Sequence, residues 1–289
     1  MKSPMFTFGL WICLGLASTN AHAFYDASPL QDADPQVDAF AGNVVALGVD
    51  GHFCSGLLVG ESMILTAAHC FFDKKKIVDP MPLDSKLVGR ALEVLRFNPK
   101  DPQKPYRHSI EKYSVVAPQD FQNKWDSESG DIALVSFRTK FPNSFSDKLI
   151  EINDAWVADA LGRCKAGDPC LLYALSARKG DFNFAVTNKF QKISLEPRRS
   201  FFVLTAYDKD FIGEGGDSGS PVILCENMHD AAGCRLVGNY VSSNSWTQPW
   251  EGRISTTVWY EVLKRRSGEG FLVFCADNAG GTSCERPLS

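Results

Sequence analysis

Three motifs, far apart along the chain, each carry one side chain of a kind used in nucleophilic catalysis. Ser218 lies in the run Gly-Gly-Asp-Ser-Gly-Ser-Pro at 215–221, His69 follows a Leu-Thr-Ala-Ala run, and Asp131 precedes Ile-Ala-Leu. A serine hydroxyl is a poor nucleophile at neutral pH unless an imidazole takes its proton and a carboxylate fixes the tautomer of that imidazole. The pattern therefore predicts that Ser218 is a nucleophile, His69 its general base and Asp131 the orienting acid.

The surroundings of these residues support this interpretation. Asp131 stands directly before the apolar run 132–135, where a buried carboxylate is costly without a partner, and His69 is the natural candidate. Position 220 is Ser, and a strand-like Pro-Val-Ile-Leu follows it. A nucleophile elbow instead has the pattern Gly-x-Ser-x-Gly and continues into a helix. The run around Ser218 is therefore not such an elbow.

The first 23 residues predict a cleavable export signal. Lys2 precedes an apolar stretch at 6–17, and Ala-His-Ala at 21–23 is a small-x-small cleavage site. The apolar stretch is shorter than the ~20 residues that a membrane-spanning helix needs. We therefore expect a mature chain that begins at Phe24, is secreted to the periplasm or the exterior, and has no membrane partner after signal cleavage.

Composition and cysteine usage narrow the class of partner. The formal net charge is −4, whereas proteins that bind nucleic acid carry a basic face, so we expect no nucleic acid partner. No Cys-x-x-Cys pair occurs, and His52, His69, His108 and His229 form no ligand pairs, so we expect no metal and no cofactor. Once Cys13 leaves with the signal peptide, eight cysteines remain, and an even number indicates disulfides in an exported chain.

Short runs rich in Val, Ile, Leu, Phe and Thr, separated by Gly, Pro, Asp and Asn, predict two groups of six strands. Helical periodicity is scarce, so we expect an all-β protein of antiparallel barrels or sandwiches. The stretch 138–169 has few strand signals and is expected to connect the groups. A C-terminal helix is expected at 258–266, where cations suit its last turn. The expected strands are 44–49, 53–59, 63–67, 87–97, 110–116 and 132–137, then 170–177, 185–195, 201–206, 221–225, 236–242 and 254–257.

Four motifs together resemble the chymotrypsin/trypsin-like serine peptidase family. They are Phe-Cys-Ser-Gly at 53–56, Leu-Thr-Ala-Ala-His-Cys at 65–70, Asp-Ile-Ala-Leu at 131–134 and Gly-Asp-Ser-Gly-Ser-Pro at 216–221. The order His, Asp, Ser is that of this family and not that of subtilisins or α/β-hydrolases. The resemblance spans roughly 44–265 and implies two six-stranded antiparallel β-barrels with the catalytic groups in the cleft between them.

The resemblance implies the following organisation along the chain. A signal peptide occupies 1–23, and the segment 24–40 is either a pro-segment or the activating terminus. The first β-barrel is expected at 41–148, and the second, with its C-terminal helix, at 149–289.

The resemblance also implies roles for the neighbours of Ser218. The backbone N–H groups of Gly216 and Ser218 would form the oxyanion hole, and Asp217 would pair with a freshly liberated α-amino group that keeps the hole open. The sequence departs from the family here, because no Ile-Val-Gly-Gly start and no Arg-Ile bond occurs within 24–42. We expect that signal cleavage before Phe24, or a trim within 24–40, supplies the amine. Without one, another donor must satisfy Asp217.

The resemblance implies a specificity pocket formed by a segment before the nucleophile and by the edge of one strand. These residues are Ile212, Gly213, Ser242, Ser243 and Asn244. Ile212 stands six residues before Ser218 and favours an apolar or small substrate side chain. Glu214 replaces the usual cysteine, so Asp210 is the alternative floor of the pocket. Arg253 lies near the far wall, where it either favours acidic substrates or is a surface cation.

The resemblance implies a disulfide between Cys54 and Cys70 that clamps the strand carrying His69. For the other six cysteines, proximity favours three local bridges that each close a loop with Gly in it. Cys170 also resembles a family cysteine that bridges to the strand after the nucleophile, so Cys170 with Cys225 remains open. The local bridges are Cys164 with Cys170, Cys225 with Cys234, and Cys275 with Cys284.

The resemblance thus predicts a secreted serine endopeptidase that hydrolyses peptide bonds through an acyl-enzyme intermediate. It is expected to be a monomer whose partner is a polypeptide substrate. The alternative is a non-catalytic protein-binding module on the same fold, which arises when such a peptidase loses a catalytic residue. In this chain all three residues are present.

Overall fold

The computed structural model describes residues 24, 27–49, 51–72, 90–118, 131–141, 164, 170–194, 202–226, 233–244, 251–256 and 271–276. The predicted signal peptide at 1–23 and the predicted C-terminal helix at 258–266 lie outside these residues, as does most of the expected connection at 138–169. No helix within the described ranges has the length and hydropathy to cross a bilayer.

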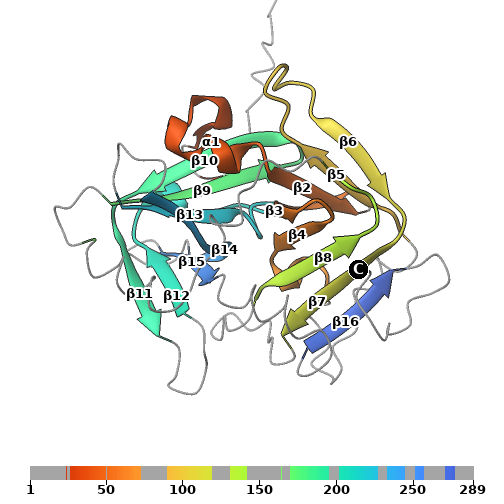
Figure 1. Cartoon of the computed structure of the whole chain (residues 1–289). Coiled ribbons are helices and arrows are strands. Elements are labelled where there is room, and N and C mark those ends of the chain that lie inside the picture. The colour runs from red at the N-terminus through yellow and green to blue at the C-terminus, as the bar shows by residue number, and fades with distance from the viewer. Residues whose placement is uncertain are drawn as a thin grey trace, which may run out of the picture.

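The first of two antiparallel sheets comes mainly from the N-terminal half of the chain (Figure 1). Its strands are β2 (Val44–Val49), β3 (His52–Gly60), β4 (Met63–Thr66), β5 (Leu92–Arg96), β6 (Tyr106–Ile110), β7 (Tyr113–Pro118), β8 (Ala133–Phe137) and β16 (Phe271–Ala276). They pair in the order β16-β7-β8-β4-β3-β2-β5-β6. Every residue of β8 is buried, as expected for a strand covered on both faces.

The second sheet comes mainly from the C-terminal half of the chain. Its strands are β1 (Ser28–Pro29), β9 (Leu171–Arg178), β10 (Asp181–Thr187), β11 (Phe190–Ser194), β12 (Phe202–Ala206), β13 (Pro221–Cys225), β14 (Cys234–Asn244) and β15 (Glu251–Thr256). They pair in the order β1-β10-β9-β13-β14-β15-β12-β11. The two sheets lie side by side in Figure 1, with β9 and β13 facing β2 and β3.

The predicted all-β architecture of two antiparallel halves is confirmed, although within the described ranges each sheet has eight strands and not six. The expected strand at 110–116 is the end of β6 and the start of β7, and the expected strand at 185–195 spans parts of β10 and β11. The turn at 111–112 contains none of the residues that separate the predicted strands, and the turn at 188–189 contains only one of them, Asn188. The remaining two strands are the terminal β1 and β16.

The first and last described strands each pair with the sheet formed mainly by the other half of the chain. The expected second barrel at 149–289 contains β16, but this strand pairs with β7 of the first sheet, from Phe271 opposite Pro118 to Ala276 opposite Tyr113. In the other direction, β1 pairs with β10 of the second sheet. The boundary near residue 148 therefore does not separate the two sheets completely, because β7 has an open edge that β16 covers.

The segment 27–41, here called the N-terminal strap, packs on the seam between the sheets. It contains β1, two 3₁₀ helices (Leu30–Asp32 and Pro35–Val37) and α1 (Asp38–Ala41). Leu30, Val37 and Phe40 are buried in a core cluster that also takes side chains from β2, β3, β9 and β10. The strap is thus an integral part of the core between the halves.

Truncating a strap residue should destabilise the whole fold. Phe40 is fully buried, so Phe40→Ala is expected to lower the free energy of unfolding by about 3 to 5 kcal/mol, as for other buried aromatic residues. Gln31→Ala, at an exposed strap position, is the control and should change it by less than about 0.5 kcal/mol. Urea unfolding measures both. Equal, small effects would contradict a structural role for the strap.

Candidate active site

Strand pairing brings His69 and Asp131 together from positions 62 residues apart. β4 and β8 are antiparallel neighbours, with Thr66 opposite Ala133. The chain leaving β4 and the chain entering β8 therefore meet at the same end of the sheet. His69 lies in the 3₁₀ helix Ala68–Cys70 just after β4, and Asp131 lies just before β8.

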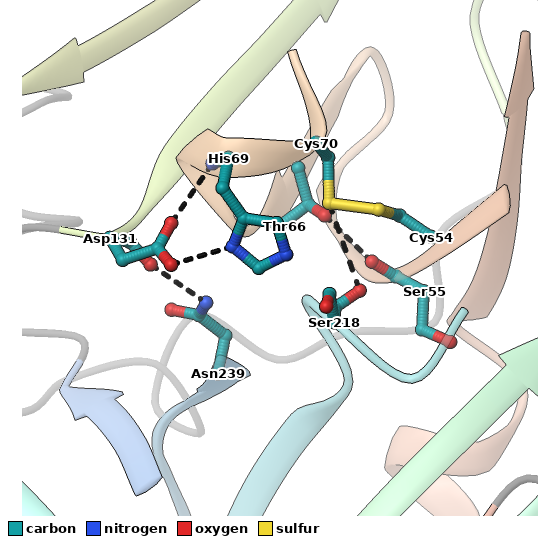
Figure 2. A network of polar contacts seen from close by, with 8 residues as sticks. All are labelled: Cys54, Ser55, Thr66, His69, Cys70, Asp131, Ser218 and Asn239. Carbon is teal, nitrogen blue, oxygen red and sulfur yellow. Dashed lines mark hydrogen bonds and ion pairs between the residues drawn. A yellow bond between two sulfur atoms is a disulfide. The ribbon is translucent and has the colours of Figure 1, made fainter. Parts of the chain in front are cut away.

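The Asp131 carboxylate holds both the backbone and the ring of His69 (Figure 2). The backbone N–H of His69 donates to Oδ1 at 3.0 Å, and Nδ1 of the ring is 2.6 Å from Oδ2. Asp131 is buried, with 8% of its surface exposed. Because a carboxylate accepts hydrogen bonds, this contact favours the tautomer with the proton on Nδ1, which leaves Nε2 free to accept a proton.

Ser218 lies on the opposite side of the imidazole from Asp131 (Figure 2). Its loop is held from the first sheet, because the backbone N–H of Ser55 donates to the Ser218 carbonyl oxygen at 2.8 Å. The sulfur of Cys70, the residue after His69, is 4.0 Å from the same oxygen. Among the described residues no hydrogen bond joins the Ser218 hydroxyl to the ring, as is common before substrate tightens such a site. The three residues predicted from the sequence are thus gathered at one place.

The loop around Ser218 presents two backbone N–H groups that its own folding does not use. The N–H groups of Asp217, Gly219 and Ser220 donate to backbone carbonyls. Within the described residues, those of Gly216 and Ser218 have no acceptor. Gly216 has a φ of +113°, a value that favours glycine. Two free donors on either side of Asp217 can bind an oxygen that gains negative charge.

Gly219 is required by the close approach of the two sheets. Its φ is +87°, and a Cβ there would lie 2.2 Å from the carbonyl oxygen of Ser55 and 2.2 Å from Oγ1 of Thr66. The backbone N–H of Gly219 donates to the carbonyl oxygen of Tyr240 at 2.7 Å. Any side chain at this position would push the loop that carries Ser218 away from β3.

Gly219→Ala is therefore expected to destabilise the fold by about 4 kcal/mol, from backbone strain and overpacking together. Gly215→Ala is the matched control in the same loop, because a Cβ at Gly215 would meet nothing within 4 Å. Thermal unfolding of both variants measures the difference. A Gly219→Ala protein as stable as the control would show that the loop does not pack as described.

Asp217 is fully buried beside Ser218 and has two hydrogen-bond donors. The hydroxyl of Ser176 donates to Oδ1 at 2.6 Å, and the backbone N–H of Glu214 donates to Oδ2 at 2.7 Å. Burial raises the pKa of Asp217 to about 7, although both hydrogen bonds and the charge of Arg178 favour the ionised form. Asp217 therefore has two donors other than an α-amino group, the Ser176 hydroxyl and the Glu214 backbone N–H.

The residues expected to form the specificity pocket are only partly described. Ile212 is half-buried after the 3₁₀ helix Lys209–Phe211, and the N–H of Gly213 donates to the Tyr240 hydroxyl at 2.8 Å. Ser242 lies in β14 opposite Arg253 of β15. Ser243 and Asn244 continue β14, but their side chains lie outside the described part, as does that of Arg253. The pocket therefore stays a prediction.

Three residues near the site were not found by sequence reasoning. The amide of Asn239 donates to the Asp131 carbonyl oxygen at 3.1 Å and so ties β14 to the segment before β8. Ser55 and Ser176 hold the loop of Ser218. Only Ser55 had a signal in the sequence, its position directly after Cys54 in the 53–56 motif.

The disulfides agree with the local pairing. Cys54 bonds to Cys70, Cys164 to Cys170, and Cys225 to Cys234. The alternative of Cys170 with Cys225 is wrong, because each of these cysteines already has its local partner. The expected bridge between Cys275 and Cys284 lies outside the described side chains. In the described ranges no cluster of three His, Cys, Asp or Glu residues could hold a metal ion.

Several solved structures are similar to this chain. The structure of a Glu endopeptidase in complex with MPD is 13% identical, with a TM-score of 0.50, and the match covers 84% of this chain and 98% of that chain. The inactive form of the Rv3671c protease of M. tuberculosis is 16% identical, with a TM-score of 0.47 and coverage of 85% and 98%. Neuropsin, a serine protease expressed in the limbic system of mouse brain, is 17% identical, with a TM-score of 0.43 and coverage of 78% and 95%.

The likeness to the Glu endopeptidase shows that the two curled sheets form a chymotrypsin-like double β-barrel fold. The trypsin family model matches residues 35–249, which include all four motifs found in the sequence. The chain therefore belongs to the trypsin family of serine proteases.

Proposed function

We propose that this protein is a secreted serine endopeptidase that cuts polypeptides through an acyl-enzyme intermediate. The observation that supports it most directly is the double contact of Asp131 with His69, which leaves the other edge of the imidazole turned toward Ser218 (Figure 2). A carboxylate that fixes an imidazole in this way prepares it to take a proton from a serine hydroxyl.

In the first half of the reaction, Oγ of Ser218 forms a bond to the carbonyl carbon of the substrate. Its proton moves to Nε2 of His69, and the carbonyl oxygen becomes an oxyanion. The N–H groups of Gly216 and Ser218 stabilise this charge, each contributing about 100- to 1000-fold in rate. The carbon–nitrogen bond then breaks, and the proton on Nε2 passes to the leaving amine.

In the second half, a water molecule attacks the ester carbon of the acyl-enzyme. His69 takes one proton from this water, and the same two N–H groups stabilise the second oxyanion. The bond to Oγ of Ser218 breaks, and His69 returns the proton to that oxygen. The enzyme is regenerated with no net change in its own protonation.

The substrate side chain that precedes the cut is proposed to be apolar or small, because Ile212 stands at the expected pocket position. Ile212 and Gly213 form one wall, and Tyr240 positions them, since its hydroxyl accepts from the Gly213 N–H and donates to the Phe211 carbonyl oxygen at 3.0 Å. Strong cleavage after Arg or Lys in a peptide library would contradict this preference.

The segment 1–23 is proposed to direct export, in keeping with the disulfides of the described chain. The mature protein is proposed to act as a monomer on a polypeptide substrate, with no nucleic acid or membrane partner. It is proposed to need no metal or cofactor, since the three side chains supply every proton transfer in the mechanism.

Incubation of the secreted protein with a peptide library, followed by mass spectrometry of the products, tests the proposal. We expect new peptide termini with the wild-type chain and none with Ser218→Ala. The residues at the new termini would also report the preference of the specificity pocket. Binding of peptides without any cleavage by the wild-type protein would instead indicate the non-catalytic binding module.

A further inference from the structure

The buried carboxylate of Asp217 lies between the two proposed oxyanion donors, so whatever holds it also holds them. It is fully buried, and among the described residues its hydrogen bonds come from Ser176 and Glu214. The charged groups that face it are Arg178 and Glu214, and these two side chains form an ion pair with each other. Arg178 also covers Gly216, since its Cγ lies 2.8 Å from where a Cβ at Gly216 would be.

Ser55 holds the residues on both sides of Asp217. Its hydroxyl donates to the Gly216 carbonyl oxygen at 2.9 Å, and its backbone N–H donates to the Ser218 carbonyl oxygen at 2.8 Å. The Ser55 hydroxyl oxygen is itself fixed, because it accepts the Ala177 N–H at 2.9 Å. Since Ser55 lies in the first sheet and Ala177 in the second, this contact spans the seam of the molecule.

Ser55 and Ser176 form a connected pair, with their hydroxyl oxygens 3.3 Å apart. Both side chains are fully buried. Ser176 fixes the Asp217 side chain, and Ser55 fixes the peptide groups before and after it. Every residue of the segment 216–218 is therefore held by one of the two serines.

Phe24, at the expected mature terminus, is held by packing and backbone pairing. Its side chain is fully buried, with its ring centroid 6.0 Å from that of Phe211 and 5.0 Å from that of Tyr240. Its backbone forms an antiparallel bridge with Gly213. None of these contacts depends on a charge at the terminus.

We propose that Ser55 and Ser176 are positioning residues that hold the oxyanion hole in its working shape without a free α-amino group. This inference rests on the proposed function. It means that activity requires only the folded chain and that no α-amino group has to be liberated at Phe24. The trypsin-family arrangement, in which an α-amino group pairs with the residue at Asp217, is replaced by the Ser176 hydroxyl and the Glu214 backbone N–H as donors to the carboxylate.

The serine pair can follow a change in the protonation of Asp217. When the carboxyl is ionised, the Ser176 hydroxyl donates to it. When the carboxyl takes up a proton, as its pKa of about 7 allows near neutral pH, it can donate to Ser176, whose own proton then turns toward Ser55. An α-amino group has a pKa of about 8 and would lose its charge at alkaline pH. The two arrangements therefore differ in their pH profiles.

The first test changes the terminus. Gly-Ser is inserted between Ala23 and Phe24, and mass spectrometry reads the terminus of the secreted product. We expect kcat within about 2-fold of the wild-type value and a pH profile that superimposes on it between pH 8 and about 9.5, because an amine moved by two residues cannot serve as a buried partner. If this extended but folded protein turned over substrate about 10-fold more slowly than the wild type, or slower still, the proposal would be overturned.

The second test changes the serines. Ser176→Ala is expected to lower kcat by about 10- to 100-fold with little change in KM, since a small misplacement of the donors costs about this much. Ser176→Thr, which keeps the hydroxyl, should recover most of the loss, and Ser55→Ala should resemble Ser176→Ala. Ser114→Ala is the control, because that buried hydroxyl has no hydrogen-bond partner among the described residues. An unchanged kcat in both alanine variants would overturn the proposal.

The outcomes separate this inference from the proposed function. A wild-type protein that cleaves nothing overturns the proposed function, and this inference with it. An active wild-type enzyme that loses activity on extension, or keeps it in both alanine variants, overturns this inference alone. If Ser176→Ala fails to fold, as judged by thermal unfolding, Ser55→Ala and the extended protein decide.

Discussion

Ser218→Ala is expected to lower kcat by about 10⁶-fold, the scale on which loss of the nucleophile acts in triad enzymes. In this variant His69 has no hydroxyl proton to take, and no Oγ is present to attack the carbonyl carbon of the substrate. KM should change little, because the Ser218 backbone N–H remains in place. The measurement is the steady-state hydrolysis of a peptide substrate identified from the library.

A neighbouring serine provides the control for this variant. Ser220 is fully buried, and its hydroxyl has no hydrogen-bond partner among the described residues. Ser220→Ala should therefore keep kcat within about 3-fold of the wild-type value, since removing an unpaired hydroxyl is nearly neutral. If the two alanine variants were equally active, Ser218 would not be the nucleophile.

Asp131→Asn is expected to lower kcat by about 10⁴-fold through the wrong tautomer of His69. The backbone N–H of His69 donates to Oδ1 and so selects the amide oxygen for that position. The amide nitrogen would then face Nδ1, which must become an acceptor, and the ring proton would move to Nε2. A protonated Nε2 cannot take the Ser218 proton.

The variant Asp208→Asn controls for the effect of removing a carboxylate charge. Asp208 lies before the 3₁₀ helix Lys209–Phe211 and interacts with Thr187 and Lys189. Its replacement should leave kcat within about 3-fold of the wild-type value, because its carboxylate interacts with Thr187 and Lys189 and not with His69 or Ser218. Both variants are compared by kcat, with thermal unfolding to show that each is folded. A similar small loss in both would contradict the role of Asp131.

The three proposed catalytic residues could be found from the sequence because each lies in a short contiguous motif. Their meeting was anticipated from the chemistry of the three residue types and from the family resemblance. The structure adds the physical reason for His69 and Asp131, the register of Thr66 opposite Ala133 between β4 and β8. Strand positions were predictable where apolar runs end at Gly, Pro, Asp or Asn. Two pairs of strands were merged, because the turn at 111–112 has none of these residues and the turn at 188–189 has only Asn188.

The support of the site could not be read from the sequence, because it depends on contacts between distant segments. Ser55 and Ser176 are 121 residues apart and meet only once β3 and β9 face each other across the seam. Asn239 reaches Asp131 across 108 residues. No local pattern distinguishes these polar residues from other serines and asparagines in strands.

The pairing of β16 with β7 is also invisible to local patterns, since any apolar strand with an open edge could accept it. The strap shows the opposite case. The resemblance implied that 24–40 is either a pro-segment or the activating terminus, whereas Leu30, Val37 and Phe40 are buried in the core between the halves. The burial of these apolar side chains holds the strap against the two sheets.

Covalent labelling of the folded protein with a sulfonyl fluoride, followed by peptide mapping with mass spectrometry, shows directly whether Ser218 is an activated nucleophile. We expect one adduct per chain, on Ser218, and much slower labelling in His69→Ala, because the imidazole no longer takes the proton. An intact wild-type fold that gains no adduct at Ser218, or that reacts equally fast without the imidazole of His69, would contradict this expectation.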